Sequence, residues 1–173
     1  MALKVAIVGL SNSSHHLAPW GDKSWQLWGL AWDSDWIHFH RTFEMHDLSE
    51  LKAGYVESLE HRTGLYTQWA DGFIPNSKQY PFDAVAESVG DYWCSSIAYM
   101  MALAIHEGAE EIGIYGVDMK ADDEYGYQKP NMEYLVGLAR GKGIKVHIPA
   151  CSPLCKFVSV PDVQYAGRYG RLP

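Results

Sequence analysis

The stretch 91–119, DYWCSSIAYMMALAIHEGAEEIGIYGVDM, places the strongest constraint on how this chain can fold. Apolar residues recur at i, i+3, i+4, i+7 and i+8 from Ile97, which predicts a helix with a buried face. Gly108 stands where a left-handed residue would end that helix. The apolar run 112–117 then predicts an interior strand, closed by Asp118. A helix followed directly by a buried strand is the repeating unit of an α/β sheet.

Two places in this unit suit a ligand. The first helical turn offers unpaired backbone N–H groups, with the hydroxyls of Ser95 and Ser96 beside them, and such a turn can hold a phosphate. Asp118 follows the strand, and open α/β sheets bind ligands beyond the carboxyl ends of their strands. The alternative is that the serines only cap the helix and Asp118 only starts a turn. The residues by themselves favour this alternative.

The rest of the chain alternates between strand and helix patterns. We expect strands at 4–8, 26–31, 41–45, 65–69, 112–117 and 144–148. Helices are expected at 48–63, with an interruption near Gly54, at 81–89 and at 130–140, and a loop at 70–81. This alternation predicts the α/β class, as a single Rossmann-like domain with a mostly parallel central sheet of about six strands flanked by helices. The domain is expected to span residues 1–157 and to be followed by an extended C-terminal tail, 158–173.

Composition excludes several functions. The net charge of −7, from 21 acidic and 14 basic residues, is poorly suited to gripping the phosphates of duplex nucleic acid. No run approaches 18 apolar residues, so we expect no membrane partner. The three cysteines, Cys94, Cys151 and Cys155, form no disulfide framework and indicate a reduced, cytoplasmic protein.

The first strand leads into a short polar loop. Gly9 is followed by the polar residues Ser11, Asn12, Ser13 and Ser14, as in the opening of a nucleotide-binding α/β unit. The motif G-x-G-x-x-G is missing, so we expect no dinucleotide cofactor, and no other cofactor either. The loop can bind an anion through hydroxyls and backbone, or it is an ordinary Ser/Asn turn, and the two interpretations weigh equally.

Two further segments supply candidate ligand contacts. Trp32 follows the second strand and can stack on a base, and Asp33 lies near where an acidic residue meets ribose hydroxyls in dinucleotide folds. The polar stretch beyond Asp118 carries Tyr125, Tyr127 and Lys129. It could close over the ligand as a lid.

The densest cluster of titratable side chains surrounds the third strand and comprises His38, His40, Glu44, His46 and Asp47. His46, at the end of the strand, is a candidate general base or phosphate contact. A capping or hydrogen-bonded core histidine is the alternative, and the more ordinary one. No zinc-type spacing is present, so we expect no metal site.

The segment SSIAYMMALAIHEGAEEIGIYGVDM resembles the small bacterial sialyltransferases that use CMP-sialic acid. That family has a Thr-Ser-Gly turn, the same apolar helix and a strand ending Gly-Ile-Asp. The resemblance implies that Ser96 touches the nucleotide with Ser95 beside it, that the loop at Gly9 lies along the nucleotide, and that Tyr125 contacts a phosphate. The chain is also similar to small Rossmann-like proteins encoded by phages.

The chain departs from that family at several positions. Ile97 replaces a glycine, Trp32 and Ala31 stand where the family has an asparagine that reads the nucleotide, and Lys120 replaces a second phosphate-binding tyrosine. The segment that supplies the family's catalytic histidine has no counterpart. The resemblance therefore implies a nucleotide pocket more than it implies sialyl transfer.

The leading hypothesis is a protein that binds a nucleotide or nucleotide-derived phosphodiester at the carboxyl edge of its sheet, as a glycosyltransferase-like protein. One alternative is a phage anti-defence protein that sequesters or cleaves a nucleotide second messenger. Another is a non-catalytic structural oligomer. Whether the chain is an enzyme stays open, with His46 and Asp118 as the candidate catalytic residues. Because the helix after Ser96 is apolar nearly all round, we also expect a homo-oligomer.

Overall fold

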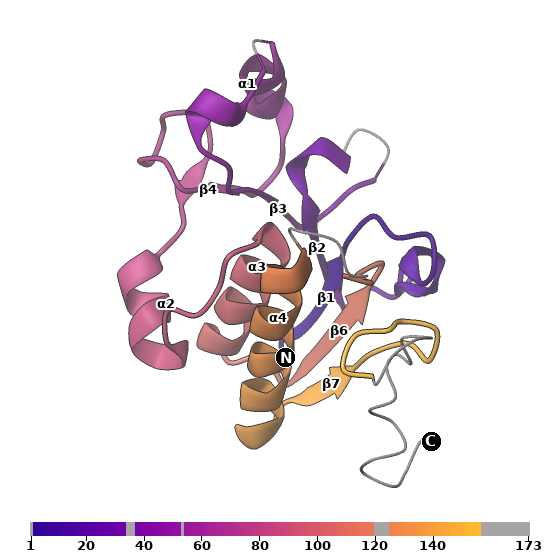
Figure 1. Cartoon of the computed structure of the whole chain (residues 1–173). Coiled ribbons are helices and arrows are strands. Elements are labelled where there is room, and N and C mark those ends of the chain that lie inside the picture. Colours follow the sequence, from indigo (N-terminus) through magenta and orange to yellow (C-terminus); the bar gives the residue numbers. More distant parts are fainter. Residues whose placement is uncertain (1, 34–36, 53, 120–124, 157–173) are drawn as a thin grey trace, which may run out of the picture.

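The computed structural model describes residues 2–33, 37–52, 54–119 and 125–156. Its centre is one sheet of seven parallel strands (Figure 1). In spatial order the strands are β5 (Lys78–Gln79), β4 (Leu65–Thr67), β3 (Arg41–Glu44), β2 (Gln26–Leu30), β1 (Lys4–Val8), β6 (Glu111–Tyr115) and β7 (Lys145–His147). The predicted α/β class with a parallel sheet is confirmed. The extra strand is β5, whose two residues lie in the segment 70–81 that sequence patterns assign to a loop.

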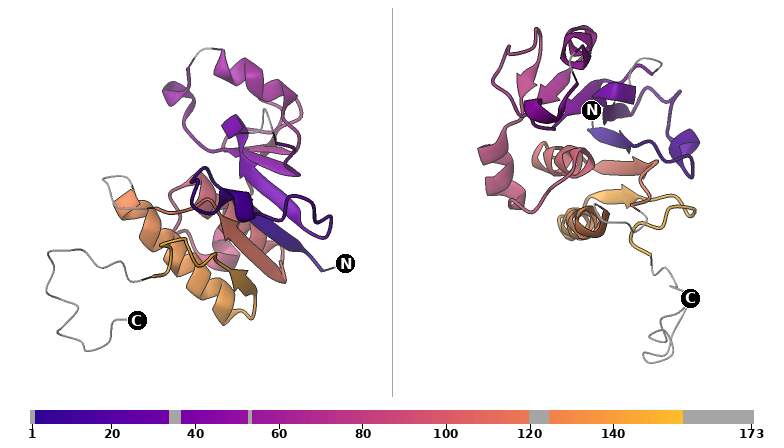
Figure 2. Two further views of the ribbon diagram at one scale, coloured as in Figure 1. Left: turned by 90° about the vertical axis from the view of Figure 1, so that its right-hand side faces the viewer. Right: turned by 45° about the horizontal axis from the view of Figure 1, so that its top comes forward.

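Three helices cover one face of the sheet: α2 (Phe82–Val89), α3 (Ser96–His106) and α4 (Tyr125–Gly141) (Figure 2). The other helical segments are short and lie in the connections: η1 (His15–Leu17), η2 (Ala31–Asp33), η3 (Leu48–Glu50), α1 (Tyr55–Ser58) and η4 (Leu59–His61). No helix in the described ranges is long and apolar enough to cross a membrane.

One helix prediction is confirmed at its interruption and another needs correction. The helical stretch 48–63 is interrupted at Gly54 as expected, because Gly54 takes a left-handed conformation with φ of 85°, and its parts are the short segments η3, α1 and η4. The helix expected to begin at Pro130 begins five residues earlier, at Tyr125, so this proline lies inside α4. Tyr127 and Lys129 are therefore helical rather than part of a lid loop.

Helix α3 is apolar nearly all round because the same chain buries it on several sides. Met100, Met101 and Leu103 are each 0 or 1% exposed and belong to the core shared by α2, α3, α4 and the sheet. A partner chain is therefore not needed to cover this helix. A homo-oligomer stays a prediction without that support.

The order of the strands reverses beside β1. From β1 the chain builds outward through β2 to β5, and it then returns through α3 to place β6 on the other side of β1. Such a reversal opens a crevice at the carboxyl ends of the two strands. Here the ends approach closely, since Gly9 donates its N–H to the carbonyl of Tyr115 at 2.8 Å and Ser11 donates to Gly116 at 2.8 Å.

The two sides of this crevice come from opposite faces of the sheet. Val5 and Ile7 pack in the core with α3, whereas Ala6 and Val8 pack on the other face with Ala18, which follows η1. The segment 9–14, which we call the β1 loop, leads to η1 and therefore toward the face opposite α3. The amino end of α3 and the β1 loop thus flank the reversal point.

Candidate functional site

Asp118 is the centre of a hydrogen-bond cluster at the reversal point. The Ser11 hydroxyl donates to its Oδ2 at 2.7 Å, and the Ser13 hydroxyl donates to its Oδ1 at 2.5 Å. The side chain of Asp118 is half-buried. Both hydroxyls of the β1 loop thus donate to the Asp118 carboxylate. This carboxylate is a negatively charged acceptor, so a ligand hydroxyl is favoured beside it over a phosphate.

Hydrogen bonds between side chains and backbone groups hold the β1 loop against the segments that follow β6 and β7. Ser14 is 0% exposed, and its hydroxyl accepts from the Gly116 N–H at 2.8 Å. From the segment after β7, Cys151 donates to the Ser13 carbonyl at 3.2 Å and Ser152 to the Val117 carbonyl at 3.0 Å. Three segments far apart in sequence therefore form one rigid frame.

Gly9 and Asn12 take different roles in the loop. Gly9 is buried and its N–H is used by the sheet, so it serves the close approach of the two strand ends. Asn12 is exposed and available to a ligand. Their predicted contacts with a nucleotide, like those of Ser11 and Ser13, stay predictions.

At the amino end of α3, the predicted cap is present. The Ser95 hydroxyl accepts from the Ala98 N–H at 3.2 Å, so this serine has the capping role. Ser96 is the first helical residue and is half-buried. In the described part of the chain, no group accepts from the backbone N–H of Ser96 or Ile97. These two donors are available for an anion.

The amino end of α4 lies beside that of α3. The Cys94 thiol donates to Oδ1 of Asn131 at 2.5 Å, and Asn131 is 3% exposed. Tyr127 is 77% exposed. The Lys129 ammonium lies 3.8 Å from the Glu133 carboxylate one turn along the helix.

Tyr125 begins α4, but its side chain lies outside what the structure describes, and so does all of Lys120. Their predicted contacts with phosphate stay predictions.

The end of β2 presents an exposed aromatic ring. Trp32 is 59% exposed, within η2 and next to the buried Ala31. Asp33 also belongs to η2, and its side chain is outside the described part. A large exposed ring beside the β1 loop is available for stacking, as predicted for Trp32.

At the end of β3, Glu44 organises the predicted titratable cluster. Its carboxylate accepts from the Nδ1 of His46 at 2.6 Å, from the His46 backbone N–H at 3.1 Å and from the Tyr55 hydroxyl at 2.6 Å. Glu44 is 4% exposed, whereas the side chain of His46 is 56% exposed. Asp47 only caps η3, and its hydrogen bonds from the Ser49 backbone N–H and, next, the Ser49 hydroxyl hold its pKa below the usual range.

The strand order places these groups along a single edge. Reading from β3 to β6, the edge carries His46, Trp32, the β1 loop and Asp118. Among the described residues, no group of three or more His, Cys, Asp or Glu side chains is arranged to hold a metal ion.

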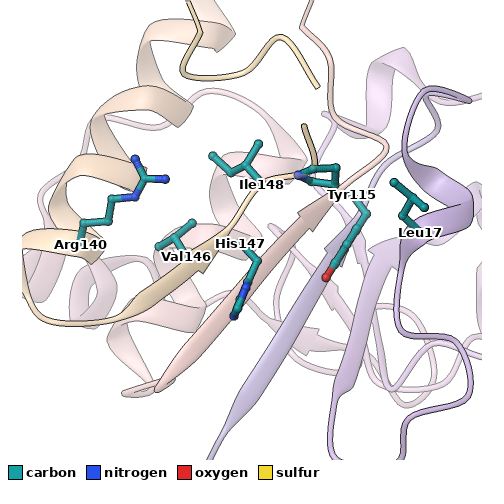
Figure 3. Close-up of a pocket in the computed structure, with 7 residues that line it drawn as sticks. Leu17, Tyr115, Arg140, Val146, His147 and Ile148 are labelled. Atoms are coloured by element: carbon teal, nitrogen blue, oxygen red, sulfur yellow. The ribbon is translucent and has the colours of Figure 1, made fainter. Parts of the chain in front are cut away.

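A pocket of about 500 Å³ lies beside β7 (Figure 3). It is lined by Leu17, Tyr115, Arg140, Val146, His147, Ile148 and Pro149. Burial raises the pKa of the Tyr115 phenol, and the nearby Glu111 carboxylate adds to the shift. None of the residues predicted from the sequence to bind a ligand lines this pocket.

Comparison with known proteins identifies a shared fold but no sequence relative. No family model matches the sequence, and no curated protein matches it. The sialyltransferase CstII from Campylobacter jejuni with CMP-3FNeuAc superposes with a TM-score of 0.58 at 16% identity, over 87% of this chain and 80% of that chain. Its complex with cytidine-5'-monophosphate gives 0.54 at 15% identity over the same shares.

A third structure extends the likeness. The sialyltransferase CST-II with a trisaccharide acceptor and CMP gives a TM-score of 0.57 at 15% identity, over 96% of this chain and 98% of that chain. At such low identity the likeness shows a shared fold. The chain therefore has the Rossmann-like α/β fold that these sialyltransferases adopt.

Sequence reasoning missed several residues of the edge. The alternation of Glu44 and His46 along a strand pointed to a shared face, but nothing signalled that Tyr55 would close on the same carboxylate. Cys151 carries no sequence signal either, because it contacts the backbone of a distant segment. Ser14 was a candidate anion contact, but it is buried and its hydroxyl accepts from the Gly116 N–H instead.

Proposed function

We propose that the chain binds a nucleotide-type ligand at the carboxyl edge of its sheet, in the crevice between β1 and β6. The supporting observation is the cluster of Ser11, Ser13 and Asp118 at the point where the strand order reverses. Ligands of open α/β sheets bind at such points. Two of the solved structures that share the fold are complexes with cytidine-5'-monophosphate and with CMP-3FNeuAc, which makes CMP a suitable probe.

The charges along the edge suggest how the ligand lies. Asp118 would accept hydrogen bonds from ribose hydroxyls, since a phosphate against this carboxylate would be repelled. The phosphate would instead lie at the amino end of α3, against the free N–H groups of Ser96 and Ile97. Tyr125 and Lys129 would approach it from α4, with Lys120 and Tyr127 as further contacts.

The base would stack on Trp32. An exposed tryptophan contributes about 1–3 kcal/mol per stacked base in nucleic-acid complexes. Because Trp32 is 59% exposed, its removal should leave the core unaffected. In this proposal a glycosyltransferase-like reaction would draw its acid or base from Asp118 or His46, both on the same edge.

The proposal can be tested by calorimetric titration with CMP. Wild-type protein should bind, and Asp118→Asn should weaken binding at least about tenfold, since one carboxylate-assisted hydrogen bond contributes about 1.5–3 kcal/mol. Trp32→Ala should weaken binding about 5- to 150-fold, the equivalent of 1–3 kcal/mol. Phe73→Ala is the matched control, because Phe73 is 54% exposed and follows β4, three strands from β1.

Each variant should melt within a few degrees of wild type. Absence of CMP binding by wild-type protein, or equal weakening by Phe73→Ala and Trp32→Ala, would refute the placement of the nucleotide.

A further inference from the structure

Glu44, His46 and Tyr55 form a cluster that nucleotide binding does not use. Glu44 ends β3, its side chain is 5% exposed, and α1 reaches it through the hydroxyl of Tyr55. Burying a carboxylate is costly unless each oxygen is hydrogen-bonded. Here Oε1 accepts two hydrogen bonds from His46 and Oε2 accepts one from Tyr55. The carboxylate is thus held in one orientation from two sides.

The same geometry fixes the imidazole of His46. With Oε1 of Glu44 2.6 Å away, Nδ1 carries the proton and donates it to the carboxylate. In the neutral ring, Nε2 is then the acceptor. Among the described residues Nε2 has no hydrogen-bond partner, and the side chain is 56% exposed. A buried carboxylate behind an exposed, oriented imidazole is the arrangement of a general base with its positioning group.

The position of the cluster relates it to the proposed nucleotide site. β3 lies two strands from β1, and neighbouring strands are about 4.8 Å apart, so the two sites are separated by roughly 10 Å along the edge. Trp32, at the end of β2, lies between them. Helix α3 also contacts β3, so a group carried by the phosphate at the amino end of α3 can extend toward β3 and bring its reacting carbon to His46.

We propose that His46 is the general base for a hydroxyl group, of water or of a saccharide, that attacks the group carried by the bound nucleotide, and that Glu44 and Tyr55 position it. The inference rests on the proposed nucleotide binding. The hydroxyl proton passes to Nε2 of His46 as the oxygen bonds to the sugar carbon. The bond from that carbon to the phosphate oxygen breaks, and its electron pair leaves with the nucleotide phosphate. The imidazolium that forms is stabilised by Glu44.

The assay is release of CMP from CMP-sialic acid in water, with calorimetric titration of CMP run in parallel. His46→Ala should lower kcat about 10²- to 10⁴-fold, the usual contribution of a general base, and leave KM and the Kd for CMP unchanged. Glu44→Gln should lower kcat between about 10-fold and about 10⁴-fold, the upper limit being the loss seen when a triad carboxylate becomes an amide. Tyr55→Phe should lower kcat by less, because two bonds to Glu44 remain.

Two controls separate catalysis from structure. His61→Ala removes another exposed histidine, located before β4 at the opposite edge of the sheet, and should leave kcat unchanged. Added imidazole should restore part of the turnover of His46→Ala, which a structural histidine would not show. His46→Ala changes only an exposed side chain, so the test stands even if Glu44→Gln fails to fold.

The outcomes distinguish the two proposals. If wild-type protein binds and releases CMP but His46→Ala keeps its kcat, the base is elsewhere and only this inference falls. If wild-type protein binds CMP without any turnover, the chain is a binding protein and the inference is again overturned, while the nucleotide site stands. If wild-type protein does not bind CMP, both fall.

Discussion

Replacing Gly116 by alanine tests the close approach on which the site depends. Gly116 has φ of 64°, and a Cβ there would lie 2.3 Å from the carbonyl oxygen of Gly9, which is backbone and cannot rotate away. Gly108 is the matched control: its φ is 73°, yet a Cβ there meets nothing within 4 Å. The two substitutions share the conformational penalty and differ in the contact with β1.

The magnitudes follow from these contacts. A left-handed conformation costs an L-residue about 1–2 kcal/mol, and the lost freedom of glycine in the unfolded chain offsets about 0.4–1 kcal/mol, so Gly108→Ala should destabilise by about 1 kcal/mol. Gly116→Ala must also push the end of β1 away. That displacement disrupts the bonds from Gly9 to Tyr115 and from Ser11 to Gly116, each worth about 1 kcal/mol, for a total of about 3 kcal/mol.

Thermal unfolding followed by circular dichroism measures the difference. At about 2–4 °C per kcal/mol for a chain of this size, Tm should fall by about 6–12 °C for Gly116→Ala and by about 2–4 °C for Gly108→Ala. Binding of CMP should weaken only in Gly116→Ala, because only that change moves the β1 loop. Equal losses of Tm in the two variants would show that the strand ends do not meet as described.

Three further predictions concern stability and assembly. The Lys4 ammonium, and next the His147 imidazole, lower the pKa of Glu111 from its usual 4.5 to about 2. A lowered pKa in the folded state adds stability above pH 4.5, and this stability is lost as the pH falls toward 2. Between these pH values the Tm of wild-type protein should therefore fall more steeply than the Tm of Glu111→Gln. Parallel curves of Tm against pH would contradict this. Ser95→Ala should lower the free energy of unfolding by about 0.5–2 kcal/mol in urea titrations, because Ala98 loses its capping acceptor; an unchanged midpoint would refute that role. Light scattering should show a homo-oligomer, and a mass of one chain would end that prediction.

Much of the fold could be predicted from local pattern. The apolar spacing predicts the helix, and the two adjacent serines predict a cap at Ser95 or Ser96; the helix is confirmed, and the structure shows Ser95 as the cap. The strands other than β5 were also located, since each is long enough for its apolar residues to mark it. A strand of two residues such as β5 has no sequence pattern of its own and is defined only by its pairing with β4.

The candidate site likewise has a part that the sequence could predict and a part that it could not. The sequence could locate Asp118 and His46 at the ends of strands, because a strand end is a local property. It could not show that the Ser11 and Ser13 hydroxyls would donate to Asp118, across more than 100 residues of chain. Nor could it show that Tyr55 would meet Glu44, since α1 was hidden within a longer predicted helix.

The sequence by itself determined most of the strands and helices of this protein, apart from β5 and the start of α4, because periodicity depends on neighbours a few residues away. Only the tertiary structure decided the order of the strands and which polar side chains pair at their ends. That order depends on which apolar surfaces exclude water together, and on buried groups such as Glu44 finding every hydrogen-bond partner they need.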